Sequence, residues 1–340
     1  MQKTVLICLV RSTLPFPSVT HKNIYKFGGV AVLMNILITG ASGFVGKNVL
    51  LRKPAHWSVT AVYNKAADFP DFLKAHNIQQ VTAVQCDLSD ATAVQRCFGD
   101  KQFDACLYLA AHVDPNESLA DPLRDLKTNT VSLVSFLQSG VKIGRFVYFS
   151  SGSVYEGKTG AVDASTPVRP LLPYSIAKEM SERYVESFAQ RGNPHEYVIV
   201  RFFGCYGPHE PERKIYRKLV RQFAVERNPA IQIYGDGSNK IYAMYVDDAV
   251  HGIQHVVEGK AKNVIVDFCG EEHFTIRELI EHAATVFELP ARIEYTGAAA
   301  AEAHAFSVTN DLFFKLFHFK PQISLDEALK LYAEHLHEEN

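Results

Sequence analysis

The stretch from Asn35 to Arg52 constrains the fold of this 340-residue chain more than any other part of its sequence. An apolar run at 35–39 leads directly into Gly40-Ala-Ser-Gly43-Phe-Val-Gly46, and a helix-like segment follows at 47–52. A strand, a glycine-rich turn and a helix in this order place backbone N–H groups and a helix N-terminus where they can bind a pyrophosphate. We therefore expect a dinucleotide to be held by Gly40, Ser42, Gly43, Phe44, Val45 and Gly46.

From Met34 onward, apolar runs alternate with helix-like segments, which is typical of an α/β fold with a doubly wound parallel (Rossmann) sheet. The pattern is less regular after Arg201, where an amphipathic helix is predicted from Glu212 to Arg227. The predicted strands lie at about 35–39, 58–63, 80–85, 104–109, 144–150, 196–201, 231–234, 241–246 and 263–268. The other predicted helices begin near Phe44, Phe69, Asp90, Asp121, Pro173, Val246, Thr275 and Leu325.

Composition excludes several classes of protein. The chain is 47% hydrophobic and 21% charged with a formal net charge of −2, which fits neither a disordered chain nor a nucleic-acid binder. The apolar run at 4–10 is too short to span a membrane. Six scattered cysteines form no C-x-x-C pair, which favours a reducing, cytoplasmic setting over disulfides or structural zinc. His251 and His255 lack the glutamate of a zinc-protease motif, so no metal is expected.

The sequence Tyr174-Ser-Ile-Ala-Lys178 is the candidate for proton chemistry. A helix over 173–191 would place the phenol of Tyr174 and the ammonium of Lys178 on one face, one turn apart. A phenol ordinarily has a pKa near ~10, and a fixed cation nearby lowers that pKa. A Tyr and a Lys at this spacing are also common on solvated helix faces, so the pair gains weight only from the motifs around it.

Hydroxyl groups end the predicted strand that precedes this pair. Ser150 and Ser151 close the strand, and Ser153 follows two residues later. Because ligands of an open parallel sheet bind at the carboxyl ends of its strands, these hydroxyls are expected to face the same crevice as the glycine turn.

Taken in order, these motifs resemble the extended short-chain dehydrogenase/reductase family, the NAD(P)-dependent nucleotide-sugar epimerases, dehydratases and reductases. The resemblance covers residues 34 to about 330. Besides the glycine turn and the tyrosine-lysine pair, its marks are Cys86-Asp87-Leu88, Leu109-Ala110-Ala111, Ser150-Ser151 before Val154-Tyr155, Arg201-Phe-Phe-Gly-Cys-Tyr-Gly-Pro208, and Gly235-Asp-Gly237 followed by Val246-Asp-Asp248.

The resemblance implies further cofactor contacts, at Asp87, Leu88, Leu109, Ala110, Ala111 and Phe202. Asp87 resembles the family residue that contacts adenine, although an N-cap or turn role fits the sequence equally well. Ala110 and Ala111 would let a cofactor approach the backbone, and such small residues also pack well between a sheet and a helix.

The strand at 58–63 bears on the choice between NAD and NADP. NAD-binding members carry an acid at the end of this strand, which accepts hydrogen bonds from the ribose hydroxyls. Here Asn64 and Lys65 follow the strand and no acid occurs before Asp68. A 2′-phosphate would meet a cation, so of the two cofactors the sequence favours NADP(H) over NAD. The alternative is that Lys65 only solvates a loop.

The resemblance also implies the catalytic roles. Tyr174 would transfer the hydroxyl proton of a sugar carbinol as hydride moves to or from the nicotinamide. Lys178 would support the phenolate and hold the nicotinamide ribose. Ser151 would give the reacting oxygen a second hydrogen bond. The expected substrate contacts are Ser151, Ser153, Gly204, His209 and Lys240.

Departures from the family narrow the reaction. The 4,6-dehydratases carry Asp-Glu where this chain has Gly152 and Ser153, so the acid and base for removing water are missing. In the epimerase-reductases a Cys/His pair inverts carbons beside the ketone; His209 matches the histidine, but Ser153 stands at the cysteine. Gly204 replaces a usual Asn. The usual Arg one position after Lys240 is absent, and a lysine could replace its charge but not its bidentate geometry.

The expected substrate is a nucleotide sugar, and the reaction is C4 epimerisation through a transient ketone or net reduction of a 4-keto sugar. Because the strand at 58–63 favours NADP(H) and epimerases recycle a tightly held NAD, the sequence slightly favours net reduction over epimerisation. Alternatives are an NADPH-dependent reductase of a non-nucleotide carbonyl compound and a dinucleotide sensor without turnover. Family members commonly dimerise through a four-helix bundle, so we expect a homodimer in which the tyrosine helix faces a partner or the core with Met180, Tyr184, Val185 and Phe188.

The expected domains follow the family as well. Residues 34–203, with 241–270 returning to them, would form the dinucleotide-binding domain, and 204–240 with 271–335 the smaller interleaved substrate domain. Residues 1–33 fit nothing downstream and are interpreted as a leader or a start codon placed too early. A basic stripe on the helix at 212–227 is either a solvated face or attracts an anionic substrate; it consists of Lys214, Arg217, Lys218 and Arg221.

Overall fold

The computed structural model describes residues 26–27, 30–31, 33–233, 235–297 and 305–339. The chain divides into two units, Met1–Leu33 and Met34–Asn340. In the first unit, the short strands β1 (Lys26–Phe27) and β2 (Val30–Ala31) pair antiparallel. The expected leader at 1–33 lies for the most part outside the described residues.

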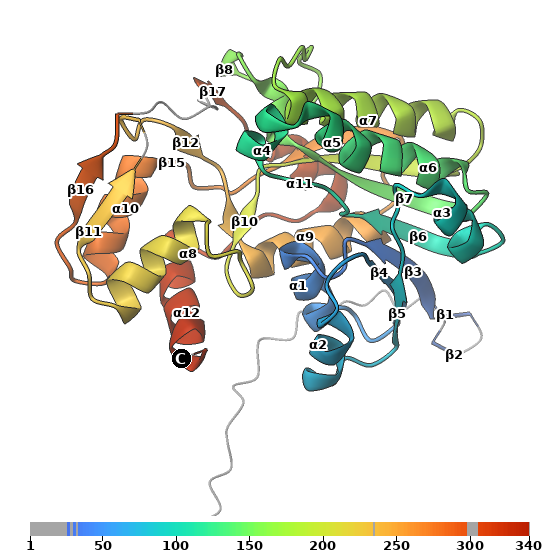
Figure 1. The fold of residues 1–340 in the computed structure, drawn as a ribbon, viewed down its shortest axis with the longest axis horizontal. Coiled ribbons are helices and arrows are strands. Elements are labelled where there is room, and N and C mark those ends of the chain that lie inside the picture. The colour runs from blue at the N-terminus through green and yellow to red at the C-terminus, as the bar shows by residue number, and fades with distance from the viewer. Residues whose placement is uncertain (1–25, 28–29, 32, 234, 298–304, 340) are drawn as a thin grey trace, which may run out of the picture. The chain divides into compact units, whose positions relative to one another are not determined.

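A seven-stranded sheet forms the centre of the second unit (Figure 1), and every ladder in it is parallel. Its order is β5-β4-β3-β6-β7-β9-β14, so the direction of winding reverses between β3 and β6. A crevice for ligands opens at such a switch point. The strands are β3 (Met34–Thr39), β4 (Trp57–Tyr63), β5 (Val81–Gln85), β6 (Gln102–Tyr108), β7 (Lys142–Ser151), β9 (Glu196–Phe202) and β14 (Val264–Phe268). The doubly wound parallel sheet predicted from the sequence is confirmed.

Helices bury both faces of the sheet, which is why its strands read as continuous apolar runs. Ile36 and Ile38 point to one face and Leu37 to the other, and all three are fully buried. Burial of each such side chain contributes about 1.5–3 kcal/mol. The first face packs against α1 (Phe44–Arg52), α2 (Phe69–Ala75), α9 (Val246–Glu258) and α11 (Asp311–Phe317). The second packs against α3 (Ala91–Phe98), α6 (Ser132–Gln138) and α7 (Pro173–Ala189).

A further apolar core lies in the C-terminal half, outside the sheet. Strands β11 (Ala230–Ile233) and β16 (Arg292–Tyr295) pair in parallel within it. Its helices are α8 (Ile215–Val220), which continues into the π-helical turn η3 (Arg221–Val225), α10 (Ile276–Val286) and α12 (Leu325–Glu338). The helix predicted over 212–227 is therefore shorter at both ends.

The basic stripe predicted on that helix is wrong as a single solvated face. Arg217 is buried, and its guanidinium lies 2.8 Å from Glu212 Oε1 and 2.7 Å from Glu339 Oε2. Arg221 pairs with the same Glu212 carboxylate at 3.2 Å. Arg217 thus joins the segment before α8 to the end of the chain after α12. Because both arginines are paired, neither is available to attract a substrate.

Several short elements differ from the predicted pattern. The strand predicted at 241–246 is two strands, β12 (Lys240–Ile241) and β13 (Met244–Tyr245), which pair with β15 (Phe274–Thr275) and β10 (Cys205–Tyr206). The helix expected near Asp121 is a chain of α4 (Pro115–Ala120), α5 (Pro122–Leu126) and the π-helical turn η1 (Lys127–Val131). The remaining elements are the 3₁₀ turn η2 (Gly152–Tyr155) and the paired strands β8 (Thr159–Ala161) and β17 (Ala305–Ser307). Across the described ranges, no helix has the length and apolarity to cross a membrane.

Candidate active site

The glycine turn after β3 packs closely against neighbouring backbone segments. Gly40 has φ +66°, and a Cβ placed there would lie 2.8 Å from the backbone nitrogen of Ala110 at the end of β6. A Cβ on Gly46 would lie 2.6 Å from the Gly40 carbonyl oxygen, so Gly46 lets helix α1 pack onto the turn. Gly43 is the N-cap of α1, and no side chain of the described residues caps it. The first N–H groups of α1 are thus suited to an anion such as a pyrophosphate.

A cavity of about 760 Å³ extends from this turn along the carboxyl ends of β3, β4, β5 and β6. Asp87 lies on its wall, where the Ser89 N–H donates to Asp87 Oδ1 at 2.9 Å and the hydroxyl at 2.8 Å. These bonds lower the pKa of Asp87 and show that the turn role foreseen for it is real. Ten of the predicted cofactor residues line this cavity: Gly40, Ser42, Gly43, Asn64, Lys65, Asp87, Leu88, Leu109, Ala110 and Ala111.

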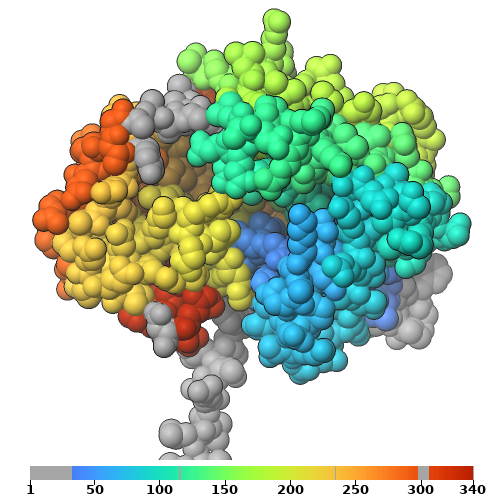
Figure 2. Space-filling view, in the orientation of Figure 1, coloured from blue at the N-terminus to red at the C-terminus, as the bar shows by residue number. Residues whose placement is uncertain are grey.

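A second cavity of about 480 Å³ adjoins the first and shares Leu109 and Ala111 with it. It is lined by residues at the ends of β7 and β9 and in the segment that leads to α8. Figure 2 shows the surface hollowed between that yellow segment, the green helices α4 and α5, and the blue region around α1. Ser151, Tyr174 and Lys178 all line this cavity. The other predicted cofactor or substrate residues that line it are Phe44, Val45, Ser153, Phe202, Gly204 and Lys240.

The tyrosine and the lysine stand on α7, which begins at Pro173 as N-terminal prolines favour. The Lys178 ammonium donates to the carbonyl of Phe149 at 2.8 Å and lies 5.9 Å from the centre of the Tyr174 ring. Burial lowers the pKa of Lys178 to about 8, against the opposing charges of Asp125 and Glu182. The lysine is therefore held still beside the phenol that it is expected to support.

Ser151 ends β7 in an extended conformation and caps the 3₁₀ turn η2. Its Oγ accepts a hydrogen bond from the Ser153 N–H at 3.1 Å. Because this bond uses the oxygen as an acceptor, the hydroxyl hydrogen can be donated into the cavity that Tyr174 also lines.

A buried polar network fixes α7 against the sheet next to this site. The Arg201 guanidinium donates to both oxygens of Glu182, at 3.1 and 2.9 Å, and each of the two side chains is only 4% exposed. The Ser150 hydroxyl donates to the same carboxylate. Arg201 also donates to the Tyr155 hydroxyl at 2.9 Å, and that hydroxyl donates to Asp267 at 2.8 Å. Burial raises the pKa of Asp267 to about 7.

Phe203 occupies the space beside Gly152. A Cβ at position 152 would lie 2.3 Å from Phe203 Cε1, so no larger side chain fits there unless the ring moves. The ring is held by three other aromatic rings, those of Tyr155, Tyr242 and Phe306, at centroid distances of 5.7 to 6.3 Å. This wall of the cavity is therefore closed to an acidic group at 152.

His209 is not among the residues that line the two cavities, so the structure does not bring it together with the other predicted substrate contacts. Its backbone has φ +67°. The ring packs against Phe72 and His76 of α2 and His335 of α12 at centroid distances of 5.4, 6.0 and 5.7 Å. Gly46 likewise acts through the packing of α1 rather than on a cavity wall.

Cationic groups line one part of the second cavity, among them Lys214 of the predicted basic stripe and Arg213, which the sequence did not single out. Arg213 and Lys214 join Lys240 there, and Arg213 reaches Asp114 at 3.1 Å. Glu210 also lines the cavity, and burial raises its pKa to about 8, so near neutral pH it is largely protonated and opposes an anion little. The cationic end of the cavity could accept an anionic group.

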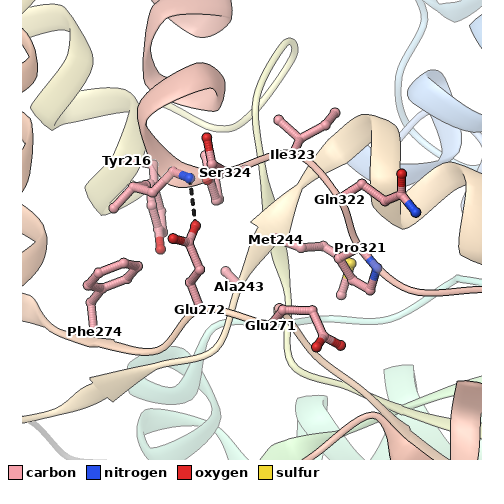
Figure 3. A pocket seen from close by; sticks show the side chains of 13 residues that line it. Tyr216, Ala243, Met244, Glu271, Glu272, Phe274, Pro321, Gln322, Ile323 and Ser324 are labelled. Atoms are coloured by element: carbon pink, nitrogen blue, oxygen red, sulfur yellow. Dashed lines mark hydrogen bonds between the residues drawn. The ribbon is translucent and has the colours of Figure 1, made fainter.

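Next to this end, Figure 3 shows a small cavity of about 150 Å³ that shares Tyr216 and Ala243 with the second one. Glu272 accepts from the Leu325 N–H at 2.7 Å and so ties the start of α12 to the loop after β14. We assign no reaction to this small cavity, and the Glu272 bond serves to hold α12 in place. In the parts of the chain that the structure describes, no group of three His, Cys, Asp or Glu side chains could hold a metal ion.

Residues 36–267 match the sequence pattern of the NAD dependent epimerase/dehydratase family. This match spans more than half of the chain and contains the glycine turn, Ser151, Tyr174 and Lys178. The protein belongs to this family. Its members include nucleotide-sugar 4-epimerases and 4,6-dehydratases among the distant relatives of this chain.

Two relatives show the extent of the family likeness. An uncharacterized UDP-glucose epimerase of Bacillus subtilis is 26% identical over 311 residues, which cover 87% of this chain and 96% of the relative. A UDP-glucuronate 4-epimerase of Thermodesulfobacterium geofontis is 26% identical over 313 residues, 86% of this chain and 93% of the relative. Among solved structures, a UDP-glucuronic acid 4-epimerase from Bacillus cereus in complex with UDP-glucuronic acid and NAD superposes with a TM-score of 0.80 at 22% identity. That match covers 90% of this chain and all of the other, and it shows the shared fold.

Proposed function

We propose that this family member acts at C4 of a sugar carried on a nucleotide, as a 4-epimerase or a 4-ketoreductase that uses NAD or NADP. The observation that carries the proposal is the meeting of Ser151, Tyr174 and Lys178 on one cavity that adjoins the dinucleotide cavity. The bound dinucleotide supplies acceptance and donation of hydride, and its pyrophosphate would lie at the turn of Gly40 to Gly46.

The protein groups move the proton. Tyr174 accepts the proton of the C4 hydroxyl or returns it to the ketone oxygen. The Lys178 ammonium stabilises the phenolate, and its bond to the Phe149 carbonyl keeps it in place. Ser151 donates a second hydrogen bond to the same oxygen and supports the negative charge that develops there.

Two features of the site favour this reaction over the reactions of other family members. Removal of water at C5 and C6 needs an acid and a base beside Ser151, and Phe203 closes the place at Gly152 where the acid would stand. Inversion beside the ketone needs a second proton-transfer pair, and His209 lies outside the cavity while Ser153 is a far weaker acid. Hydride and proton exchange at C4 needs neither group, so it is the reaction that the site supports.

The nucleotide end of the substrate would lie at the cationic end of the cavity. Arg213, Lys214 and Lys240 face a common space there, which suits a diphosphate in place of the missing family arginine. A carbonyl substrate without a diphosphate, which the alternative reductase would use, gives no reason for the two lysines in this position, whereas Arg213 also pairs with Asp114.

The cofactor choice rests on the end of β4. Asn64 and Lys65 line the cavity there, and no carboxylate follows the strand before Asp68. We infer that NADP(H) binds at least as well as NAD(H). Dissociation constants for NADPH and NADH, measured by nucleotide fluorescence on the parent and on Lys65→Asp, test the inference. The substitution should weaken NADPH and spare NADH, and a parent with a clear preference for NADH would contradict it.

The central experiment is incubation with 4-hydroxy and 4-keto nucleotide sugars and either dinucleotide, followed by mass spectrometry and NMR. Inversion at C4 without net use of cofactor identifies an epimerase, and stoichiometric oxidation of NADPH identifies a ketoreductase. Tight dinucleotide binding with no turnover of any nucleotide sugar contradicts both and favours the sensor alternative, while turnover of the free carbonyl sugar alone favours the non-nucleotide reductase.

We also propose a homodimer, as the family resemblance implies. Four side chains of α7 were expected to face either a partner or the core. Of these, Val185 is fully buried in the sheet core, whereas Tyr184 is 39% exposed. Neighbouring helices add exposed apolar side chains at Leu119, Leu123, Leu126 and Val131. Light scattering should give twice the chain mass for the parent and the monomer mass for Tyr184→Glu/Leu123→Glu. A monomeric parent would contradict the proposal.

A further inference from the structure

Behind Lys178 lies a carboxylate that the proposed reaction does not use. Asp125 is in α5 and is 1% exposed. Its Oδ1 accepts from the Asn129 amide at 2.9 Å and lies 3.7 Å from His112 Nδ1. Its Oδ2 is buried and has no hydrogen-bond partner among the described residues. A buried carboxylate in this state is costly unless a cation shares its charge.

The buried cation on which Asp125 acts is Lys178. Helix α5 packs against α7, and the Thr130 hydroxyl of the π-helical turn η1 donates to the carbonyl of Ala177, the residue before the lysine, at 3.1 Å. Asp125 is the strongest of the charges that raise the Lys178 pKa against the effect of burial. Turns of π-helix are frequent at functional sites, and this one brings the Asp125 segment against the lysine helix.

The other carboxylate near the lysine is already in use. Both oxygens of Glu182 are bound by the Arg201 guanidinium, at 3.1 and 2.9 Å. Among the described residues, Asp125 has no ion pair with an arginine or lysine within 4.0 Å, and its polar neighbours are the Asn129 amide and the His112 ring. A buried ammonium without a counter-charge costs several kcal/mol. Glu182 also acts on Lys178, but its charge is shared with Arg201, so Asp125 is the larger of the two balancing charges.

We propose that Asp125 is a positioning residue for the redox centre, whose buried carboxylate keeps Lys178 protonated behind Tyr174. The inference rests on the proposed function, because a charged lysine matters only where Tyr174 moves a proton. The other groups facing the ammonium are Tyr174 and Glu182 on α7 and the Tyr148 ring and Phe149 carbonyl on β7.

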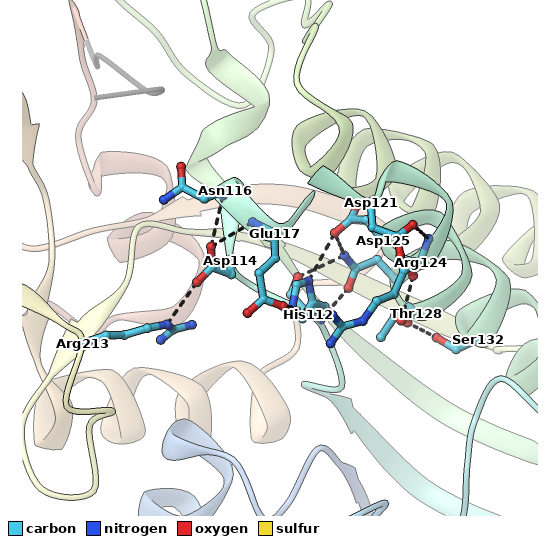
Figure 4. A network of polar contacts seen from close by, with 11 residues as sticks. His112, Asp114, Asn116, Glu117, Asp121, Arg124, Asp125, Thr128, Ser132 and Arg213 are labelled. Carbon is cyan, nitrogen blue, oxygen red and sulfur yellow. Dashed lines mark hydrogen bonds and ion pairs between the residues drawn. The ribbon is translucent and has the colours of Figure 1, made fainter. Parts of the chain in front are cut away.

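His112 connects this pair to the surface. Figure 4 shows the ring among the polar contacts of α4 and α5, with its Nε2 at 2.9 Å from Glu117 Oε2. Glu117 is 53% exposed and also binds Arg124 at 3.1 Å.

The test compares the dependence of kcat on pH in the parent and in Asp125→Asn, which removes the charge and keeps the shape. Without that charge Lys178 loses its proton at lower pH, so the alkaline limb of kcat should move down by about one pH unit or more. Glu179→Gln is the matched control, because it removes one carboxylate from the position next to Lys178 on α7, where Glu179 pairs with the exposed Arg183. Its limb should stay where the parent's lies. An unmoved limb in Asp125→Asn would overturn the proposal.

A stability measurement tests the same pair without turnover. Asp125→Asn should lower the Tm of the parent, because it leaves the ammonium unbalanced, and it should raise or not change the Tm of Lys178→Met, where the carboxylate is itself unbalanced. If Asp125→Asn alone does not fold, the double variant should regain a folding transition. Equal destabilisation in both backgrounds, or no recovery, contradicts the proposal. A parent that turns over no nucleotide sugar would refute the proposed function alone, since this cycle needs no substrate.

Discussion

Replacing Glu182 by Gln should cost far more stability than the same change three residues earlier. The Glu182–Arg201 pair is 4% exposed on both sides and bonded through two N–H groups, and the Ser150 hydroxyl shares the carboxylate. Removing one charge of a buried pair leaves the other uncompensated, at a cost of about 3–5 kcal/mol. The Glu179–Arg183 pair lies at i, i+4 with the arginine 74% exposed, and such a pair contributes only about 0.3–0.5 kcal/mol.

The assay is urea unfolding of the parent, Glu182→Gln and Glu179→Gln, followed by far-ultraviolet circular dichroism at one pH and salt concentration. The difference in free energy of unfolding between the two variants should be about 3 kcal/mol or more, with similar slopes against urea. Both variants change net charge by the same amount on the same helix, so long-range electrostatics cancel. A difference below about 1 kcal/mol would show that the network does not hold α7 in place.

Three further predictions concern the site and its surroundings. Tyr174→Phe should lower kcat by about 10²–10⁴-fold while NADPH binding, measured by fluorescence, is retained; turnover at the parent rate would remove Tyr174 from the mechanism. Gly40→Ala should abolish dinucleotide binding in the same titration, because its Cβ would lie 2.8 Å from the Ala110 nitrogen at a φ of +66°. Unchanged affinity would refute the role of the glycine turn in binding the dinucleotide. Burial lowers the pKa of His209 to about 4, so the fold favours the neutral ring; its stabilisation is complete above the unfolded value near ~6.5 and is lost as pH falls toward 4. His209→Gln should therefore flatten the decline of stability with acid over this window, and an equally steep decline would contradict the assignment.

The sheet and the reactive pair could be predicted from sequence because their signals are local. A parallel strand covered on both faces must be apolar at consecutive positions, as at Ile36, Leu37 and Ile38, and the run itself reveals it. The four-residue spacing of Tyr174 and Lys178 places them on one helix face wherever that helix packs. The glycine turn is equally local, since its shape depends on backbone freedom at neighbouring positions.

The features that sequence could not reveal depend on contacts between distant segments. His209 follows the family motif, yet its ring packs against Phe72 of α2 and His335 of α12. Arg217 is spaced like its basic neighbours, but its partner Glu339 lies at the end of the chain. Asp125 looks like a surface aspartate beside Arg124, and only the fold shows it buried against the lysine helix.

The contact between Phe203 and Gly152 limits how this chain can change. An acidic residue at 152 would collide with a ring that Tyr155, Tyr242 and Phe306 hold in place. A smaller residue at 203 alone would leave a void between those rings, and such voids cost about 3–5 kcal/mol when a phenylalanine is lost. Neither substitution is favourable first, so a descendant that eliminates water would have to acquire both together or pass through a destabilised ancestor. The two positions are therefore expected to vary as a pair in any lineage that shares this aromatic wall.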